Sequence, residues 1–420
     1  MVERRRLHRR LIVDLTPLRE SPRFRILYIA QLLASIGRQI TVVAVPFQVY
    51  ILTESTLAVG ALGLAQFIPL MVVSIIGGAV ADAFDRRVLL VAGHLLLALT
   101  ALGLVFNASL AEPAIWPLYV LSAINAAFTA FNNPARMAAI PALLRRELIA
   151  PGFALNSTMH EVAAAIGPAI AGLLIAQYDL VVAYSVEAIA FLAAALTLLR
   201  VGQLRPEGGG RAVGMTSIRE GFHYLKGQPL IQSGFLIDLN AMIFGMPQAL
   251  FPALGTMTFG GDASTVGLLY AAPGIGALVA ALTSGWVGSV SRRGRVVVVA
   301  VVIWGVAIAI FGLLTNLALA LALLAVAGAA DVVSAVMRNT ILQLTVPDQL
   351  RGRLSAVHTA VVGGGPRLGD LEAGAVAALT SVRFSVVSGG VACVIGALAI
   401  ARWMPQLWNY RDEDIGSPTG

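Results

Sequence analysis

Long apolar runs that recur along the whole chain constrain its fold more than any other feature of the sequence. Each run is close to the ~20 residues that a helix needs to cross a bilayer. Between the second and third runs lie only six residues, 82–87, and four of them are charged. A loop this short can only join two antiparallel membrane helices that end on the same side. The sequence therefore predicts an all-α integral membrane protein.

The composition indicates the same class. Hydrophobic residues make up 58% of the 420 residues and charged residues only 12%, whereas soluble domains carry about 25% charged residues. The single cysteine, Cys393, rules out an intrachain disulfide framework and a thiolate metal site. The sequence also shows no metal-ligand spacing, nucleophile elbow or phosphate-binding loop. We therefore expect no catalytic residues, no metal, no cofactor and no nucleic-acid partner.

The apolar runs number twelve and divide six and six around one long polar segment. Arginine is concentrated at the N-terminus, in this segment and in the loops on the same side, so both termini are expected in the cytoplasm. The expected domains are a cytoplasmic arm (1–25), an N-terminal six-helix half (26–199), a cytoplasmic linker (200–229), a C-terminal six-helix half (230–404) and a cytoplasmic tail (405–420). The expected spans are 26–52, 57–81, 88–110, 115–131, 153–176, 181–199, 230–257, 266–287, 296–314, 317–337, 354–379 and 382–404.

The two halves repeat each other in sequence. With a shift of 207 residues, Gly60 falls on Gly267 and Arg86 falls on Arg293. Two six-helix halves related by an axis along the membrane normal are a transporter architecture, with the substrate path between them. The second copy of the charged loop, 289–295, lacks both aspartates of the first. The halves are therefore not expected to be functionally equivalent.

The loop between the second and third spans has the pattern Gly-x-x-x-Asp-x-x-x-Arg-Arg, formed by Gly78, Asp82, Arg86 and Arg87. With twelve spans and a degenerate second copy, this pattern resembles the major facilitator superfamily. Passages 24–60, 266–285 and 340–353 resemble most closely its branch of bacterial siderophore exporters and related drug pumps. The resemblance implies a major facilitator fold, with twelve transmembrane helices in two six-helix pseudo-symmetric halves.

The same resemblance implies a function. We expect a secondary active transporter of the bacterial inner membrane that exports a siderophore or an amphipathic small molecule by alternating access, with proton antiport. A multidrug efflux antiporter is the alternative, and a lipid transporter or a uniporter is less favoured. The expected partners are the small-molecule substrate, protons and membrane lipids, with the protein acting as a monomer rather than as an enzyme.

The charged loop is expected to act as a gate. By the family's architecture, Asp82 lies near the start of the eleventh helix, where a carboxylate would be attracted by unpaired backbone donors. Such a contact would stabilise the outward-facing state. Asp85 stands where the superfamily usually has glycine, and the sequence does not name its partner. The full gating set is Gly78, Asp82, Asp85, Arg86 and Arg87.

Charged and amide side chains within the spans are candidates for the substrate and proton pathway, because charges inside a membrane are costly and by default functional. Arg38 lies half-way along the first span and is expected to contact an anion or pair with an internal acid. Asp331 and Arg338 share a helix face, although Arg338 also suits a cytoplasmic anchor. The full set is Arg38, Asn125, Glu161, Asp238, Asn240, Asp331, Arg338, Asp370 and Glu372.

Two further patterns bear on the mechanism. Gly167, Pro168 and Gly172 resemble the superfamily's antiporter signature, with Ala171 in place of one glycine, and so favour export. In the eleventh span, residues 363–366 predict a helix break just before three charged residues. Glu187 is expected either to join those charges or to extend to the membrane surface. The histidines at 94, 160 and 358 are expected to be satisfied interior polar groups more often than proton relays.

Overall fold

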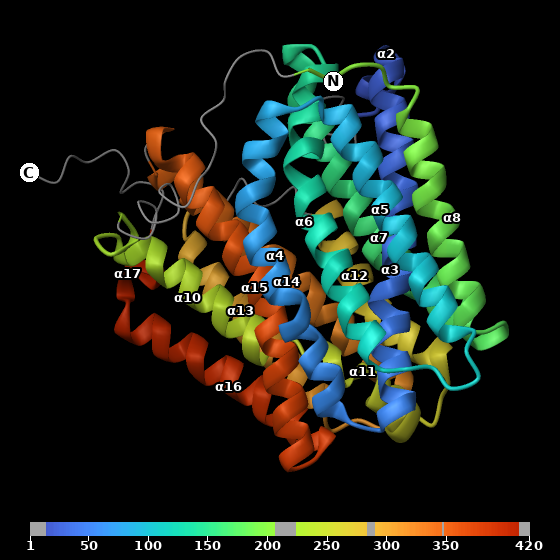
Figure 1. Ribbon diagram of the computed structural model, residues 1–420. Helices are drawn as coiled ribbons and strands as arrows, with labels where there is room; N and C mark the ends of the chain where they lie inside the picture. The colour runs from blue at the N-terminus through green and yellow to red at the C-terminus, as the bar shows by residue number, and fades with distance from the viewer. Residues whose placement is uncertain (1–13, 206–223, 284–289, 347, 411–420) are drawn as a thin grey trace, which may run out of the picture. The chain divides into compact units, whose positions relative to one another are not determined.

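The computed structural model of the chain describes residues 14–205, 224–283, 290–346 and 348–410. All regular elements within these residues are helices (Figure 1). Ten of the helices are long and apolar enough to cross a membrane. Helices α6 (Trp116–Leu143) and α15 (Asp348–Leu379) also reach membrane length, with 28 and 32 residues, but carry more polar side chains.

Short connections join most neighbouring helices, and the long segment 199–228 separates α8 from α10 (Figure 1). Before the linker lie α2 (Thr16–Glu20), α3 (Pro22–Thr53), α4 (Thr56–Ala83), α5 (Arg86–Ala108), α6, η1 (Arg146–Leu148), α7 (Ile149–Gln177) and α8 (Leu180–Leu198). After it lie α10 (Pro229–Phe244), η2 (Gln248–Leu250), α11 (Phe251–Ala253), η3 (Leu254–Thr258), α12 (Ala263–Leu282), α13 (Arg293–Phe311), α14 (Leu317–Thr345), α15, α16 (Val382–Trp403) and α17 (Pro405–Asn409).

The fourth and tenth helices extend further than the sequence predicts. The fourth span is expected to end at residue 131, yet α6 continues to Leu143 with Pro134 and Pro141 inside it. A proline removes one backbone hydrogen bond and often ends a helix. Here α6 packs against α3, α5 and α7, and this tertiary packing outweighs the lost bonds. The extension places Arg136 within a helix rather than in a loop.

The expected helix break in the eleventh span is wrong, and a break occurs in the seventh span instead. Helix α15 runs without interruption through residues 363–366, where a break is predicted. The expected span over 230–257 matches a membrane-length segment over residues 229–258. Within it, α10 ends at Phe244 and short 3₁₀, α and π turns follow. The indole Nε1 of Trp304 donates a 2.7 Å hydrogen bond to the carbonyl of Gly245. This bond satisfies a carbonyl that the break leaves without a helical partner.

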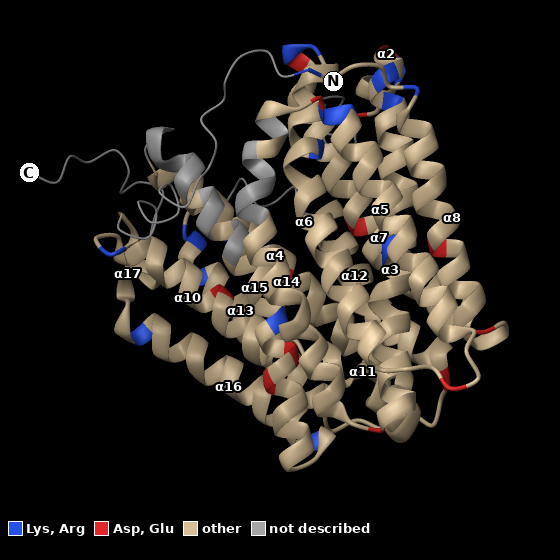
Figure 2. Cartoon of the chain, in the orientation of Figure 1, with Lys and Arg blue, Asp and Glu red and all other residues tan. Residues whose placement is uncertain are grey.

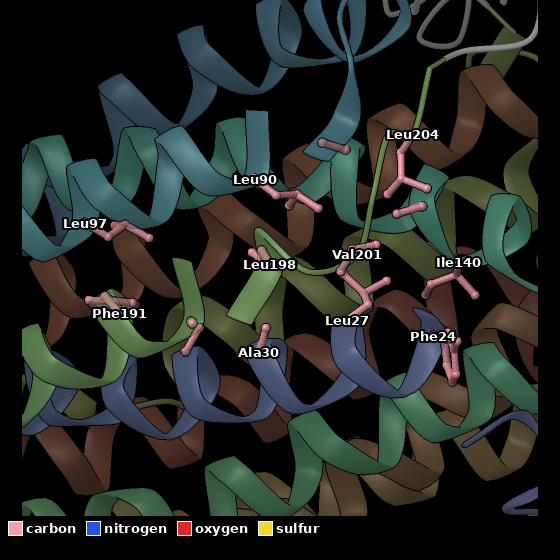
Figure 3. Packing of buried hydrophobic residues seen from close by; sticks show 14 of the residues in the cluster. Phe24, Leu27, Ala30, Leu90, Leu97, Ile140, Phe191, Leu198, Val201 and Leu204 are labelled. Atoms are coloured by element: carbon pink, nitrogen blue, oxygen red, sulfur yellow. The ribbon is translucent and has the colours of Figure 1, made fainter. Parts of the chain in front are cut away.

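Contacts within the chain divide it into two units. Unit 1 comprises residues 1–54, 65–214 and 261–271, and unit 2 comprises residues 55–64, 215–260 and 272–420. The core of unit 1 lies where α3, α5 and α8 meet. There Leu27 of α3, Leu90 and Leu97 of α5 and Phe191 and Leu198 of α8 bury their side chains together (Figure 3). Close van der Waals packing of these side chains holds the three helices together, because lipid is as apolar as the side chains themselves.

Glycines allow two helix pairs to approach closely, one pair in each unit. In unit 2, a Cβ on Gly60 of α4 would lie 2.6 Å from the carbonyl oxygen of Asp370 on α15. In unit 1, a Cβ on Gly267 of α12 would lie 2.5 Å from the carbonyl oxygen of Pro168 on α7. The sequence repeat that aligns Gly60 with Gly267 thus corresponds to the same type of contact in both units.

We expect Gly172→Ala to destabilise the protein. A Cβ at position 172 would lie 2.5 Å from the carbonyl oxygen of Ala263 and 2.8 Å from Cα of Gly267, and overpacking of this kind costs about 1–3 kcal/mol. Thermal unfolding in detergent, followed by size-exclusion chromatography, would measure the effect. Gly234→Ala on α10 is the control, because nothing lies within 4 Å of a Cβ there. Equal unfolding temperatures for the two variants would contradict the close contact.

Candidate functional site

A buried ion pair lies in unit 2 between α10 and α14. Arg338 Nη1 pairs with Asp238 Oδ1, and the two side chains are only 8% and 2% exposed. His358 of α15 lies within electrostatic range of both charges and packs its ring against Phe235, with 6.0 Å between the ring centroids. The pair and the histidine therefore bring three helices together around one buried set of charges. Arg338 is thus placed inside the unit rather than at a membrane surface.

An open pocket borders this ion pair, with about 410 Å³ of empty space that includes open solvent. Asp238, Arg338, His358 and Asn339 supply its polar groups. Its other walls are mostly apolar and come from α10, α14 and α17, with Leu230, Ile231, Phe235, Ile341, Leu342 and Leu407. Apolar walls with a few convergent polar groups are the usual form of a small-molecule site.

A second cavity, of about 350 Å³, lies at the break between α10 and η2. Asp331, Gln248 and Trp304 are among its lining residues. Asp331 and Arg338 are predicted to share a helix face and both lie on α14. The structure nevertheless places them at different cavities. The two residues are seven positions apart along α14, so each one lies beside different neighbouring residues.

The remaining pathway candidates in unit 2 form hydrogen bonds mainly with backbone groups. Asn240 Nδ2 donates a 2.8 Å hydrogen bond to the carbonyl of Cys393 and so links α10 to α16. Asp370 Oδ1 accepts a 3.1 Å hydrogen bond from the N–H of Ala249, at the break after α10. Its Oδ2 lies 3.8 Å from Arg367 Nη1. Glu372 is half-buried and forms no ion pair with any residue that the structure describes.

In unit 1, Glu187 of α8 is fully buried. Thr41 of α3 donates its hydroxyl to this carboxylate, 2.5 Å from Oε1 and 2.6 Å from Oε2. Arg38, one turn earlier on α3, lies within electrostatic range of the same carboxylate. The expectation that Glu187 joins the eleventh helix or extends to the membrane surface is therefore wrong. The reason is that α3 offers it a hydroxyl and a cation inside the same unit.

A second polar contact in unit 1 joins α6 to α7. Arg136 Nη1 contacts His160 Nε2, and Arg136 Nη2 donates a 2.7 Å hydrogen bond to Asn133 Oδ1. A guanidinium group can only donate, so His160 accepts at Nε2 and carries its proton on Nδ1. Glu161, the next residue, is half-buried and makes no ion pair among the described residues. Asn125 is buried on α6 at 6% exposure.

The sequence reasoning missed Arg136 as a candidate because it ended the fourth span before Pro134. The signal that could have found it is the apolar pattern, which resumes after Pro134 and continues to Leu143. For His358 and His160, the sequence favours satisfied interior groups over proton relays. Nothing in a single sequence indicates that α15 brings His358 to a charge pair formed by α10 and α14.

The charged loop is held within unit 1 by backbone contacts. Asp85 Oδ1 accepts hydrogen bonds from the N–H groups of Arg87, at 2.9 Å, and Leu204, at 3.0 Å. Arg87 Nη2 donates to the carbonyl of Leu199 at 2.6 Å, and Arg86 Nη1 donates to a carbonyl of α6 at 3.3 Å. The partner of Asp85 is thus the start of α5 together with the segment after α8.

The other gating positions lie outside what the structure describes. The surroundings of Gly78 and the side chain of Asp82 fall among the undescribed positions, as does residue 289 of the second loop copy. In the antiporter-like motif, a Cβ on Gly167 would lie 2.5 Å from Gln39 Cγ of α3. Pro168 lies inside α7, and Gly172 contacts α12. The motif therefore lies at two helix contacts.

Charged side chains are scarce along the middle of the described helices and gather near their ends (Figure 2). The few internal charges are therefore the groups most able to act on a ligand or a proton. No group of three or more His, Cys, Asp or Glu residues in the described ranges is arranged to hold a metal ion.

The chain is similar over almost its whole length to proteins named as enterobactin exporters. It is 30% identical over 404 residues to the enterobactin exporter EntS of Citrobacter koseri, with 95% of this chain and 96% of that protein covered. It is 30% identical over 394 residues to the enterobactin exporter EntS of Shigella boydii, with 93% and 94% covered.

Solved transporter structures share the fold at low sequence identity. A mutant of the nucleoside transporter NupG superposes with a TM-score of 0.76 at 13% identity, over 90% of this chain and 99% of that one. A bacterial homologue of the human lysosomal transporter Spinster gives 0.72 at 16% identity, over 95% and 98%. A POT family transporter gives 0.74 at 11% identity, over 92% and 97%.

The family itself is shown by a match over most of the chain. Residues 12–416 match the family described as transmembrane secretion effector. The twelve expected spans, the helical structure and the similarity to solved transporters agree with this match. The chain is therefore a multi-pass membrane protein that belongs to the transmembrane secretion effector family of the major facilitator superfamily, a superfamily of secondary transporters and not of enzymes.

Proposed function

We propose that this transporter exports a siderophore, or a similar amphipathic small molecule, across the bacterial inner membrane in exchange for protons. The observation that carries the proposal is the similarity to enterobactin exporters, which extends over 95% of this chain and 96% of the Citrobacter koseri protein. The arginine-rich loops support a cytoplasmic location for both termini. The protein is proposed to work as a monomer.

The buried pair of Asp238 and Arg338 supports proton coupling. An ionised carboxylate beside a guanidinium attracts it strongly where water is excluded. Protonation of Asp238 would cancel that attraction and release α10 from α14. His358 lies within electrostatic range of both charges, so the loss of the Asp238 charge would also change the electrostatic environment of His358. A proton at this site would thus favour one arrangement of the three helices over the other.

Coupling then follows from a shared conformational equilibrium. If the proton stabilises one orientation of the transporter and the substrate stabilises the other, each ligand lowers the affinity for its counterpart. A ligand can shift the equilibrium only by its difference in affinity for the two states. Exchange of protons for substrate therefore needs no direct contact between the two ligands.

The export proposal is tested in proteoliposomes that hold the purified, full-length protein. Enterobactin is presented on the cytoplasmic side under an imposed pH gradient, with ethidium as a cationic drug probe and protein-free liposomes as the control. We expect gradient-dependent accumulation of enterobactin. Accumulation of ethidium alone would instead identify a drug efflux pump, and accumulation that ignores the gradient would refute proton exchange.

We expect Asp238→Asn to abolish gradient-driven accumulation while exchange of substrate for substrate continues. Asparagine mimics a carboxyl group that is permanently protonated, so the conformational step that requires proton loss is blocked. Glu112→Gln, which removes an exposed carboxylate from a loop, is the matched control. If the Asp238 variant still concentrates substrate against its gradient, another acid carries the proton, and Asp370 is the next candidate.

The ion pair also has a stability signature. Arg338→Gln alone would leave the Asp238 carboxylate buried without its counter-charge, which typically costs about 3–5 kcal/mol. We expect a lower unfolding temperature for this variant, and partial recovery when Asp238→Asn is added. Thermal unfolding of the single and double variants measures the coupling. Additive losses in the double variant would show that the two charges do not stabilise each other.

A further inference from the structure

Two helices of unit 1 are joined by a hydrogen bond that only an uncharged histidine can make. Arg136 of α6 donates from Nη1 to Nε2 of His160 on α7. A guanidinium group has no acceptor, so the imidazole must accept at this nitrogen. A protonated imidazole carries a donor on both ring nitrogens. The bond therefore exists only while His160 is neutral.

Arg136 is oriented toward His160 by its own helix. Its Nη2 donates a 2.7 Å hydrogen bond to Oδ1 of Asn133, one turn earlier on α6, and its Nε is buried. Neither hydrogen-bond partner carries a negative charge. A proton on His160 would place a second positive charge against the guanidinium, where water screens charges poorly. The contact that holds the two helices together would then push them apart.

The seam between α6 and α7 lies between two tightly packed helix pairs. Helix α6 packs far more closely against α5 than against α7, and α7 packs most closely against α3. Gly93 of α5 leaves no room for a Cβ beside Asn132 of α6. A Cβ on Gly167 of α7 would lie 2.5 Å from Gln39 Cγ of α3. The Arg136–His160 bond therefore joins one pair to the other.

One end of the seam is closed by the chain itself. Helix α6 leads into α7 through residues 144–148, and a Cβ on Gly152 of α7 would lie 3.3 Å from Cγ2 of Ile140 on α6. The Arg136–His160 bond lies beyond this contact, about two turns before the end of α6 and about three turns into α7. Loss of the bond would let the two helices separate about their connected ends.

Arg136 is the charge that a proton on His160 would meet directly. Arg38 of α3 lies within electrostatic range of the imidazole, but the Glu187 carboxylate acts on Arg38 from α8. Glu161, next to His160 in the chain, is half-buried and makes no ion pair among the described residues. The charged side chains of α2 and η1, which also pack against α7, are exposed: Arg19, Glu20, Arg146 and Glu147.

We propose that Arg136 and His160 form a proton-sensitive latch, in which the neutral imidazole holds α7 against α6 and a proton on His160 opens the seam between them. In the proposed exchange, the transported proton binds Asp238 in unit 2. The latch is a separate response of unit 1 to acid, and it does not depend on which substrate is exported. It makes the movement of α7 relative to α6 depend on the pH of the compartment that reaches His160.

Distances between spin labels on the two helices test the latch in the full-length protein in nanodiscs. In a background with Cys393→Ser, nitroxides are attached at Val120→Cys on α6 and Leu173→Cys on α7, whose native side chains are 45% and 50% exposed. Double electron–electron resonance is recorded at about pH 8 and about pH 5.5. We expect the ratio of long to short distances to rise about tenfold in acid, because only the open form accepts a proton and an unhindered histidine titrates at about pH 6.5.

A second pair of labels controls for a general effect of acid on the protein. Phe106→Cys on α5, where the native side chain is 68% exposed, is combined with Val120→Cys on α6. Because α5 and α6 are closely packed, this distance should be the same at both pH values. An unchanged distance between positions 120 and 173, or an equal change in both pairs, would overturn the latch.

Two substitutions of His160 separate its charge from its size and packing. His160→Gln supplies a neutral acceptor that does not titrate, so it should keep the short distance at both pH values. His160→Lys supplies a permanent cation, so it should open the seam at about pH 8, and Arg136→Gln added to it should close the seam again. An acid response in His160→Gln equal to that of the unaltered protein would overturn the proposal. So would a short distance in a folded His160→Lys variant, with folding checked by the Phe106–Val120 distance.

The Asp238→Asn variant separates the latch from proton exchange. The acid response of positions 120 and 173 should persist in this variant, because His160 is intact. If the response disappears in Asp238→Asn and remains in His160→Gln, the proton that moves α7 binds Asp238 and the latch is wrong. If the latch responds as expected while enterobactin export ignores the pH gradient, the latch stands and the proposed exchange is wrong.

Discussion

A charge inside a membrane has to find a partner, because water is not available to solvate it. This constraint explains two buried contacts of the structure. Asp238 meets Arg338 with both side chains nearly inaccessible. Glu187 receives the hydroxyl of Thr41 and lies within range of Arg38. Each contact joins helices that are far apart in sequence. The internal charges therefore determine which helix faces turn toward one another.

The sequence predicts the features that depend on composition and period. Apolar runs of bilayer length predict the helices, and their six-plus-six pattern predicts the repeat. The sequence aligns the glycines at 60 and 267 with each other, but their partners on α15 and α7 are known only from the structure. The family resemblance adds the class of protein. These features can be predicted because they depend on the length of an apolar run relative to the bilayer and on residue size. Both properties are visible in a single sequence.

Features that depend on tertiary contacts could not be predicted in the same way. Pro134 reads as the end of a helix, but α6 passes through it because neighbouring helices support the segment. Residues 363–366 predict a helix break, but α15 is continuous there. The break that the structure shows follows Phe244, at the end of α10. The partner of Asp85 is a backbone N–H of Leu204, more than a hundred residues away. No spacing rule relates these positions, so the sequence could mark candidate residues but not their partners.

The two units differ in how they balance charge, and this difference bears on the mechanism. In unit 2, the cation Arg338 is matched by a carboxylate that a proton can neutralise. In unit 1, Arg136 has only neutral bonding partners among the described residues, and a second guanidinium lies within range. The pair in unit 2 balances its own charges, whereas Arg136 in unit 1 has no described carboxylate as a hydrogen-bond partner. The loss of the aspartates from the second loop copy shows the same divergence in sequence. A transporter whose two ligands act on different units would avoid competition between them for a single carboxylate. The two ligands would then be linked only through the equilibrium between conformations, which is the least demanding way to couple two gradients.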